Sequence, residues 1–96
     1  MKVSDITTEE IANYLRISEV DSATETELEV YLNVALKYIK DETGLTNDDL
    51  DKHEDFIIAI YVLCQDMYDN RTLYVDKNNI NKVVETVLGR HRINLL

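Results

Sequence analysis

The sequence predicts a small all-α domain, and three observations support this prediction. Apolar residues recur at helical spacing in several stretches, no stretch alternates as a strand would over a useful length, and capping sequences precede the helical stretches. A chain of 96 residues has room for a single hydrophobic core. We therefore expect residues 1–96 to form one four-helix domain, with a short first helix, a long second helix, an apolar central third helix and a short C-terminal helix.

The first helix is short and begins at a capping sequence. Thr7-Thr8-Glu9-Glu10 has the Thr-x-x-Glu form of a capping box, in which each end residue satisfies a backbone N–H of the other. The helix is expected to end near residue 16 or 17 and to be followed by a polar loop over residues 18–23.

The second helix has the clearest signals. Thr24-Glu25-Thr26-Glu27 offers another capping box, and the helix is expected to end near Thr43 with Gly44 as the left-handed residue behind it. At 100° per residue its apolar side chains form one arc, made of Leu28, Tyr31, Leu32, Ala35, Leu36, Tyr38 and Ile39.

Two valines of this helix, Val30 and Val34, fall outside that arc, on the side of Lys37 and Asp41. Either the arc is wider than its seven members, or the two valines contact another subunit. Both interpretations stay open, and Val30 and Val34 are candidate contact residues.

An acidic turn over residues 47–55 precedes the third helix, which is predicted over residues 56–70. The first half of this helix, Phe56 to Cys64, is apolar on all sides, which is typical of a helix enclosed on every face. A chain this small has difficulty enclosing a helix completely. Ile58 and Val62 are therefore candidates for contact with another chain.

The last helix follows a connector over residues 71–77. We expect Asn78 or Asn79 to cap it and Gly89 to end it. One face should carry Ile80, Val83, Val84, Val87 and Leu88. The remaining tail, residues 90–96, is expected to be flexible in the isolated chain, and its candidate contact residues are Arg90, Arg92 and Ile93.

The net charge of −9 is distributed unevenly. Residues 1–55 carry fifteen acidic and five basic side chains, a net of −10, whereas residues 56–96 carry four acidic and five basic ones, a net of +1. Such a chain is a poor nucleic-acid binder, since phosphate neutralisation needs the opposite sign. The asymmetry either serves solubility or gives head-to-tail complementarity between copies, as in a heterologous ring.

Catalytic, metal and cofactor sites have no support in the sequence, and we expect no enzyme activity. His53 and His91 lack metal-binding spacing with Cys64 or with each other, and the acidic run 47–51 lacks the central glycine of a calcium loop. Cys64 lies within an apolar run, where burial raises the pKa of a thiol and leaves it inert, and a lone cysteine fits a reducing compartment. The longest apolar run is also far shorter than the ~20 residues of a membrane span. We therefore expect no cofactor, no metal and no membrane partner.

The segment that ends the third helix has two interpretations. Tyr68, Asn70 and Arg71 stand where a helix C-terminus favours a cation and carbonyl-capping groups. In the first interpretation Arg71 caps its own helix and Tyr68 belongs to the core. In the second, the guanidinium holds the connector or a neighbouring subunit.

Several segments, taken in order from about Ile6 to Arg92, together resemble one protein family. They are Tyr14-Leu15-Arg16-Ile17, Ala35, Tyr38-Ile39, Thr43-Gly44, Tyr68-Asp69-Asn70-Arg71, Leu88 and His91-Arg92. This order is similar to that of the small head–tail connector proteins, or head-completion adaptors, of siphophages and related prophages. The chain departs from the family's usual pattern in having no proline and in ending on His91-Arg92 instead of Tyr-Arg.

The resemblance implies a structural protein of the virion, located at the capsid–tail junction and in the host cytoplasm during assembly. Such proteins form an oligomeric ring, typically of about twelve copies, that joins the portal protein to a tail-side completion protein and extends the DNA channel. DNA passes through it without sequence-specific contacts. Some members are described as DNA-packaging proteins, a label for genome retention and not for a catalytic step.

A second hypothesis comes from a different functional class. The net charge and small size would also suit an acidic interaction protein, such as a DNA mimic or an inhibitor of a host enzyme. A mimic needs ordered carboxylates spaced like phosphates on one face, whereas many acidic residues here are predicted in loops and first helical turns.

Overall fold

The regular secondary structure of residues 1–92, which are the residues that the computed structural model describes, is entirely helical. This confirms the all-α prediction, although there are five α-helices and two short 3₁₀ turns where four helices were predicted. In chain order the elements are η1 (Val3–Asp5), α1 (Thr8–Tyr14), α2 (Ser22–Thr43), α3 (Asn47–Leu50), α4 (Asp55–Asn70), η2 (Lys77–Asn79) and α5 (Lys82–His91).

The additional helix, α3, lies in the stretch predicted as an acidic turn. Thr46 and Asp49 form a complete capping box around its single turn: the Thr46 hydroxyl accepts from the Asp49 amide at 3.2 Å, and the Asp49 carboxylate accepts from the Thr46 amide at 3.2 Å. The acidic residues therefore satisfy backbone N–H groups, and Leu50 is directed into the core.

The end of α1 and the start of α2 differ from the prediction. Thr7 caps α1 as expected, but α1 ends at Tyr14 because Arg16 adopts a left-handed backbone (φ 60°). Helix α2 starts earlier than the predicted Thr24, at Ser22, since the Asp21 carboxylate accepts the Thr24 amide at 2.8 Å. The connecting loop, residues 15–21, therefore lies closer to the N-terminus than the predicted 18–23, and the second capping box lies inside the helix.

The C-terminal end of α2 is where the sequence placed it. Gly44 has a left-handed backbone (φ 75°), and its amide donates to the Lys40 carbonyl at 2.8 Å. Thr43 is buried at this turn, where its hydroxyl donates to the Ile39 carbonyl at 2.7 Å and accepts from the Leu45 amide at 3.2 Å. Because the buried hydroxyl both donates and accepts, these bonds offset the cost of removing it from water.

Helix α5 begins and ends later than predicted. Asn81 caps it, accepting the Val83 amide at 2.8 Å, so neither Asn78 nor Asn79 is the cap. Gly89 lies inside the helix, which continues to His91, and residues 90 and 91 therefore belong to α5 and not to a flexible tail. Val83, predicted on the inward face, is 46% exposed. Residues 93–96 of the predicted tail, including Ile93, lie outside the described residues.

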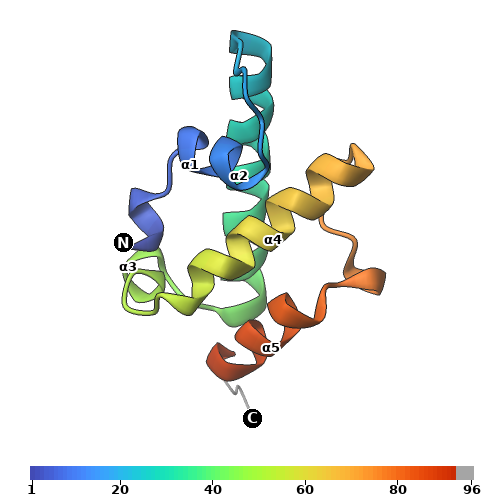
Figure 1. Ribbon diagram of the computed structural model, residues 1–96. Coiled ribbons are helices and arrows are strands. Elements are labelled where there is room, and N and C mark those ends of the chain that lie inside the picture. Colours follow the sequence, from blue (N-terminus) through green and yellow to red (C-terminus); the bar gives the residue numbers. More distant parts are fainter. Residues whose placement is uncertain (93–96) are drawn as a thin grey trace.

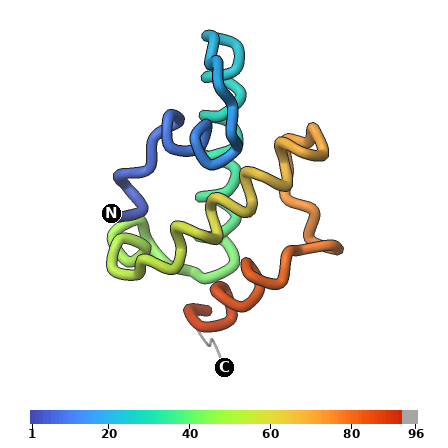
Figure 2. Tube along the Cα trace, in the orientation of Figure 1, coloured from blue at the N-terminus to red at the C-terminus, as the bar shows by residue number. Residues whose placement is uncertain are grey.

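Helix α4 is at the centre of the arrangement. Figures 1 and 2 show α4 crossing α2, while α5 lies along the other side of α4 and the N-terminus lies near α3. Helices α4 and α5 are antiparallel, since Asp55 at the start of α4 bonds His91 at the end of α5. The first turns of α2 extend beyond the other helices at the top of Figure 1.

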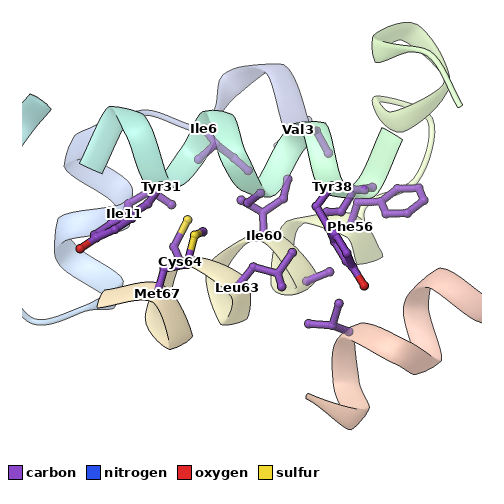
Figure 3. Close-up of a cluster of buried hydrophobic side chains, with 14 of the residues drawn as sticks. Val3, Ile6, Ile11, Tyr31, Tyr38, Phe56, Ile60, Leu63, Cys64 and Met67 are labelled. Atoms are coloured by element: carbon purple, nitrogen blue, oxygen red, sulfur yellow. The ribbon is translucent and has the colours of Figure 1, made fainter. Parts of the chain in front are cut away.

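One side of α4 forms the middle of the core. Ile60, Leu63 and Cys64 lie between α4 and α2, with Tyr31 towards one end of the cluster and Phe56 towards the other (Figure 3). The opposite side of the helix is not enclosed: Ile58 is 41% exposed. This chain alone therefore does not enclose the apolar run on every face, in line with the expectation that so small a domain leaves part of the helix open. The fully or almost fully buried residues of α4 are Phe56, Ala59, Ile60, Leu63, Cys64 and Met67.

Shortening an apolar side chain should destabilise the protein more on the buried side of α4 than on its exposed side. Ile60→Ala removes a fully buried side chain and should lower the free energy of unfolding by about 2–5 kcal/mol, because a cavity remains. The matched change Ile58→Ala, two residues away in the same helix, should cost about 1 kcal/mol or less. Urea denaturation of both variants measures the difference, and equal losses would show that Ile58 is packed as tightly as Ile60.

Candidate interaction surfaces

The predicted contact residues separate into two groups at the two ends of α4. Ile58 lies near its start, where Arg90 of α5 is close by. Tyr68, Asn70 and Arg71 lie at its end. The spacing of Ile58 from Tyr68 along one predicted helix already separates the two groups, whereas the position of Arg90 beside Ile58 depends on how α5 folds back.

The C-terminal end of α4 is held to α2 by Arg71. This residue takes a left-handed backbone (φ 54°) and closes the helix, as a glycine would in a more relaxed cap. Its guanidinium Cζ lies 4.7 Å from the centre of the Tyr68 ring, and Nη1 donates to Glu27 Oε1 at 3.1 Å. Asn70 donates from Nδ2 to the Asp66 carbonyl at 2.9 Å. The guanidinium is therefore engaged within its own molecule.

Tyr31 joins this cluster from α2. Its hydroxyl donates to the same Glu27 carboxylate, and its ring meets Tyr68 edge-on with centroids 6.5 Å apart. Burial, together with the hydrogen bond to Glu27, raises the pKa of Tyr31 to about 12. The phenol is therefore a permanent donor, and Glu27 accepts from both Tyr31 and Arg71.

The N-terminal end of α4 is held to α5 by a second electrostatic contact. His91 Nε2 and Asp55 Oδ2 are 2.8 Å apart, and Arg90 Nη1 lies 3.6 Å from the same oxygen. The His91 ring also packs against His53 and Phe56, with centroids 4.3 and 4.5 Å away. An acid in the first turn of one helix thus meets Arg90 and His91 in the last turn of its antiparallel neighbour, where the helix dipoles favour a carboxylate and a guanidinium respectively.

A shallow hollow runs along the outer side of α4 and α5. Ile58, Val83 and Val87 form its apolar lining, with Lys82, Thr86 and Arg90 around it and Asp55 at one end. A second shallow depression on the other side of Ile58 is lined by Met1, Glu54, Ile57 and Tyr61. Ile58 therefore lies between two depressions of the surface.

The remaining candidates occupy less distinctive positions. Val34 and Val62 are half-buried and pack against the core, which favours the wider-arc interpretation for Val34. Val30 is half-buried on α2. Arg92 is exposed just after α5. Neither Val30 nor Val34 lines the hollow beside Ile58.

A cavity of about 200 Å³ lies between the end of α4 and the connector. Asp66, Asn70, Tyr74, Asp76 and Asn81 are among its lining residues. Burial, reinforced by the nearby Asp69 carboxylate, raises the pKa of Asp66. The amides here cap helices or bond within the loop, so the polar groups serve the local backbone.

Residues 1–92 contain no group of three or more His, Cys, Asp or Glu side chains placed to hold a metal. Burial raises the pKa of the Cys64 thiol to about 12, so it is protonated at neutral pH, as the sequence predicted.

None of the helices within residues 1–92 is both long enough and apolar enough to cross a bilayer.

A comparison of the chain with protein-family models, with curated protein sequences and with solved structures finds no match.

Sequence reasoning missed three features of these surfaces. The contacts of His91 with Asp55 and with His53 join residues that are far apart in the chain, and no local pattern signals them. The stacking of Tyr14 on Tyr61, with centroids 4.9 Å apart, is missed for the same reason. The exposure of Val83 could have been suspected only from its place beside the cap at Asn81.

The Arg71–Glu27 contact predicts a measurable coupling between α2 and α4. A double-mutant cycle of Arg71→Gly and Glu27→Gln should show a favourable interaction that weakens as salt is added, because the pair is exposed to solvent. Arg71→Ala should be less stable than Arg71→Gly, since only glycine relaxes the left-handed backbone. A salt-independent cycle with zero coupling would contradict this.

Because the pKa of Asp66 is raised, replacing its carboxyl with an uncharged amide is expected to stabilise the protein by an amount that depends on pH. Because its folded-state pKa is above the unfolded value, the native carboxyl contributes stability at low pH that is lost as the pH rises through the folded-state pKa. Asp66→Asn should therefore raise the melting temperature at pH 7, and the gain should shrink towards pH 4. Glu29→Gln, an exposed acid on α2, is the control and should leave the pH profile unchanged. A gain that is equal at both pH values would contradict the assignment.

Proposed function

We propose that this protein is a ring-forming structural subunit of the head–tail junction of a phage or prophage particle. In this role, copies of the chain would bind one another, the portal protein on one side and a tail-side completion protein on the other. The ring would surround the DNA channel without reading sequence. The sequence resemblance from about Ile6 to Arg92 suggests this role, and the fold is compatible with it.

The observation that supports an assembled role is the open outer side of α4. Ile58 and Val83 are 41% and 46% exposed on adjacent helices, and a shallow hollow joins them. Exposed apolar surface that is contiguous and surrounded by polar groups marks interaction sites more often than scattered single residues do. A monomer gains nothing from leaving these side chains in water.

The acidic side chains give the alternative, a DNA mimic, less support. Asp21, Asp49 and Asp51 each accept a backbone N–H, and these bonds lower their pKa values. The pKa of Asp76 is lowered by the side-chain amide of Asn79 and by backbone N–H groups. Asp51 also links the end of α3 to the N-terminal turn η1, since it accepts from the Ser4 amide at 2.8 Å. Carboxylates that cap helices and join loops are not arranged as a phosphate-like row.

Electron microscopy of the purified chain tests the proposal. The protein at high concentration, and the protein mixed with the portal protein from the same genome, should show ring particles in negative stain. An unrelated acidic helical protein of similar mass serves as the control for portal binding. A chain that stays monomeric in both mixtures and does not bind the portal would overturn the proposal.

A further inference from the structure

The large apolar side chains that are exposed lie at separate places along the chain. Ile58 and Val83 belong to the hollow beside α4 and α5, whereas Leu73 and Tyr74 lie in the connector behind α4 and are 61% and 63% exposed. These two sites differ in shape as well as in place. The first is a depression on packed helices, and the second is a loop that presents its side chains outward.

The hollow combines apolar side chains with basic surroundings. Ile58, Val83 and Val87 supply the apolar surface, and Lys82 and Arg90 lie beside it. Within the described residues Lys82 makes no ion pair, and Arg90 reaches only the Asp55 oxygen at 3.6 Å, which His91 approaches more closely. A segment that fits this hollow would therefore present apolar side chains flanked by carboxylates.

The connector of this same chain has that pattern. Leu73 and Tyr74 are flanked by Asp69 and Asp76, both of which are exposed. The nearby cations are turned to other partners: Arg71 is bound to Glu27, and Lys77 Nζ lies 5.9 Å from the centre of the Tyr38 ring. The two exposed apolar side chains of the connector thus lie in sequence between two exposed carboxylates.

The connector and the hollow of one molecule do not meet. Tyr74 lines the cavity at the C-terminal end of α4, together with Asn70, whereas Ile58 lies near the other end. The helix between these positions spans roughly 20 Å at 1.5 Å per residue. Only a second copy can bring a connector to the hollow, and such a contact joins two different surfaces, which is the condition for a heterologous, head-to-tail assembly.

We propose that the Leu73–Tyr74 connector of one copy docks in the Ile58–Val83 hollow of the next. Asp69 and Asp76 of the first copy then face Lys82 and Arg90 of the second. Closure of repeated contacts into a circle rests on the proposed ring function, whereas a single contact needs only two copies of the chain. Two side chains in a shallow hollow make a small interface, so the pairwise contact is weak and transient, and many copies on a template strengthen it.

Disulfide trapping tests the contact in the full-length chain. Cys64 is buried, so an introduced surface cysteine is the only accessible thiol in the described residues. Tyr74→Cys protein, mixed with Val83→Cys protein of different mass under mild oxidation, should form the mixed dimer about tenfold more than Tyr74→Cys mixed with Asn33→Cys, an exposed control on α2. Mixed dimers no more abundant than in the control would overturn the inference.

Two other results of the same experiment would assign the hollow differently. Preferential Val83→Cys homodimers would indicate an isologous contact, in which the hollow meets its own copy, and would overturn the connector as occupant. Trapping that appears only after residues 93–96 are removed would show that the chain's own end covers the hollow, and would also overturn it. The four removed residues include three large aliphatic ones, Ile93, Leu95 and Leu96.

A charge exchange supplies an independent test with variants that change only exposed residues. Lys82→Glu and Asp69→Lys should each weaken self-association by about tenfold in analytical ultracentrifugation, and the double variant should recover most of it. Leu73→Ser should weaken association similarly, whereas Val20→Ser, at an exposed valine in the loop before α2, should not. Additive losses in the charge double variant would contradict a contact between these groups.

The outcomes also separate this inference from the proposed function. Rings on the portal without Tyr74→Cys and Val83→Cys trapping would leave the head–tail proposal standing and overturn the connector contact. Trapping without rings or portal binding would establish the contact as a mode of self-association and overturn the head–tail proposal.

Discussion

The burial of one side of α4 is the constraint on which the rest of the structure depends. Ile60, Leu63 and Met67 are almost completely removed from water, and no other helix of the described chain is apolar enough to replace them. With few residues available, α2 covers one side of α4 and α5 covers another, and the remaining side stays open at Ile58. A small chain cannot bury all of an apolar helix, since so much of its surface must face solvent.

Electrostatic contacts at the two ends of α4 fix its neighbours without contributing to the apolar core. Glu27 accepts from Arg71 and Tyr31 at one end, and Asp55 meets His91 and Arg90 at the other. The contacts of Arg71 with Glu27 and of Asp55 with α5 each join one end of α4 to another helix. Because these groups are partnered inside the molecule, the charges left for partners are those of side chains such as Lys82 and Asp69.

The surfaces that take no part in these contacts are the ones on which the proposed function depends. An acidic chain whose carboxylates cap helices has little charge arranged for mimicry, and residues 1–92 hold no cluster of side chains placed to bind a metal. What remains is an exposed apolar hollow and an exposed apolar connector, separated by most of the length of α4. A subunit with two different exposed apolar surfaces is suited to repeated assembly, and as a monomer it gains nothing from them.

The sequence by itself determined the helical class, the apolar central helix and the end of α2 at Thr43-Gly44, because these depend on residues three or four positions apart. Its prediction that α2 starts at Thr24 was wrong, because Asp21, an equally good capping residue, caps the helix instead. Only the tertiary structure decided that Ile58 and Val83 are exposed, that Val34 packs on the core and that Arg71 binds Glu27. These outcomes depend on contacts such as Asp55–His91 and Glu10–Tyr61, 36 and 51 residues apart, and no local pattern encodes which helix faces meet.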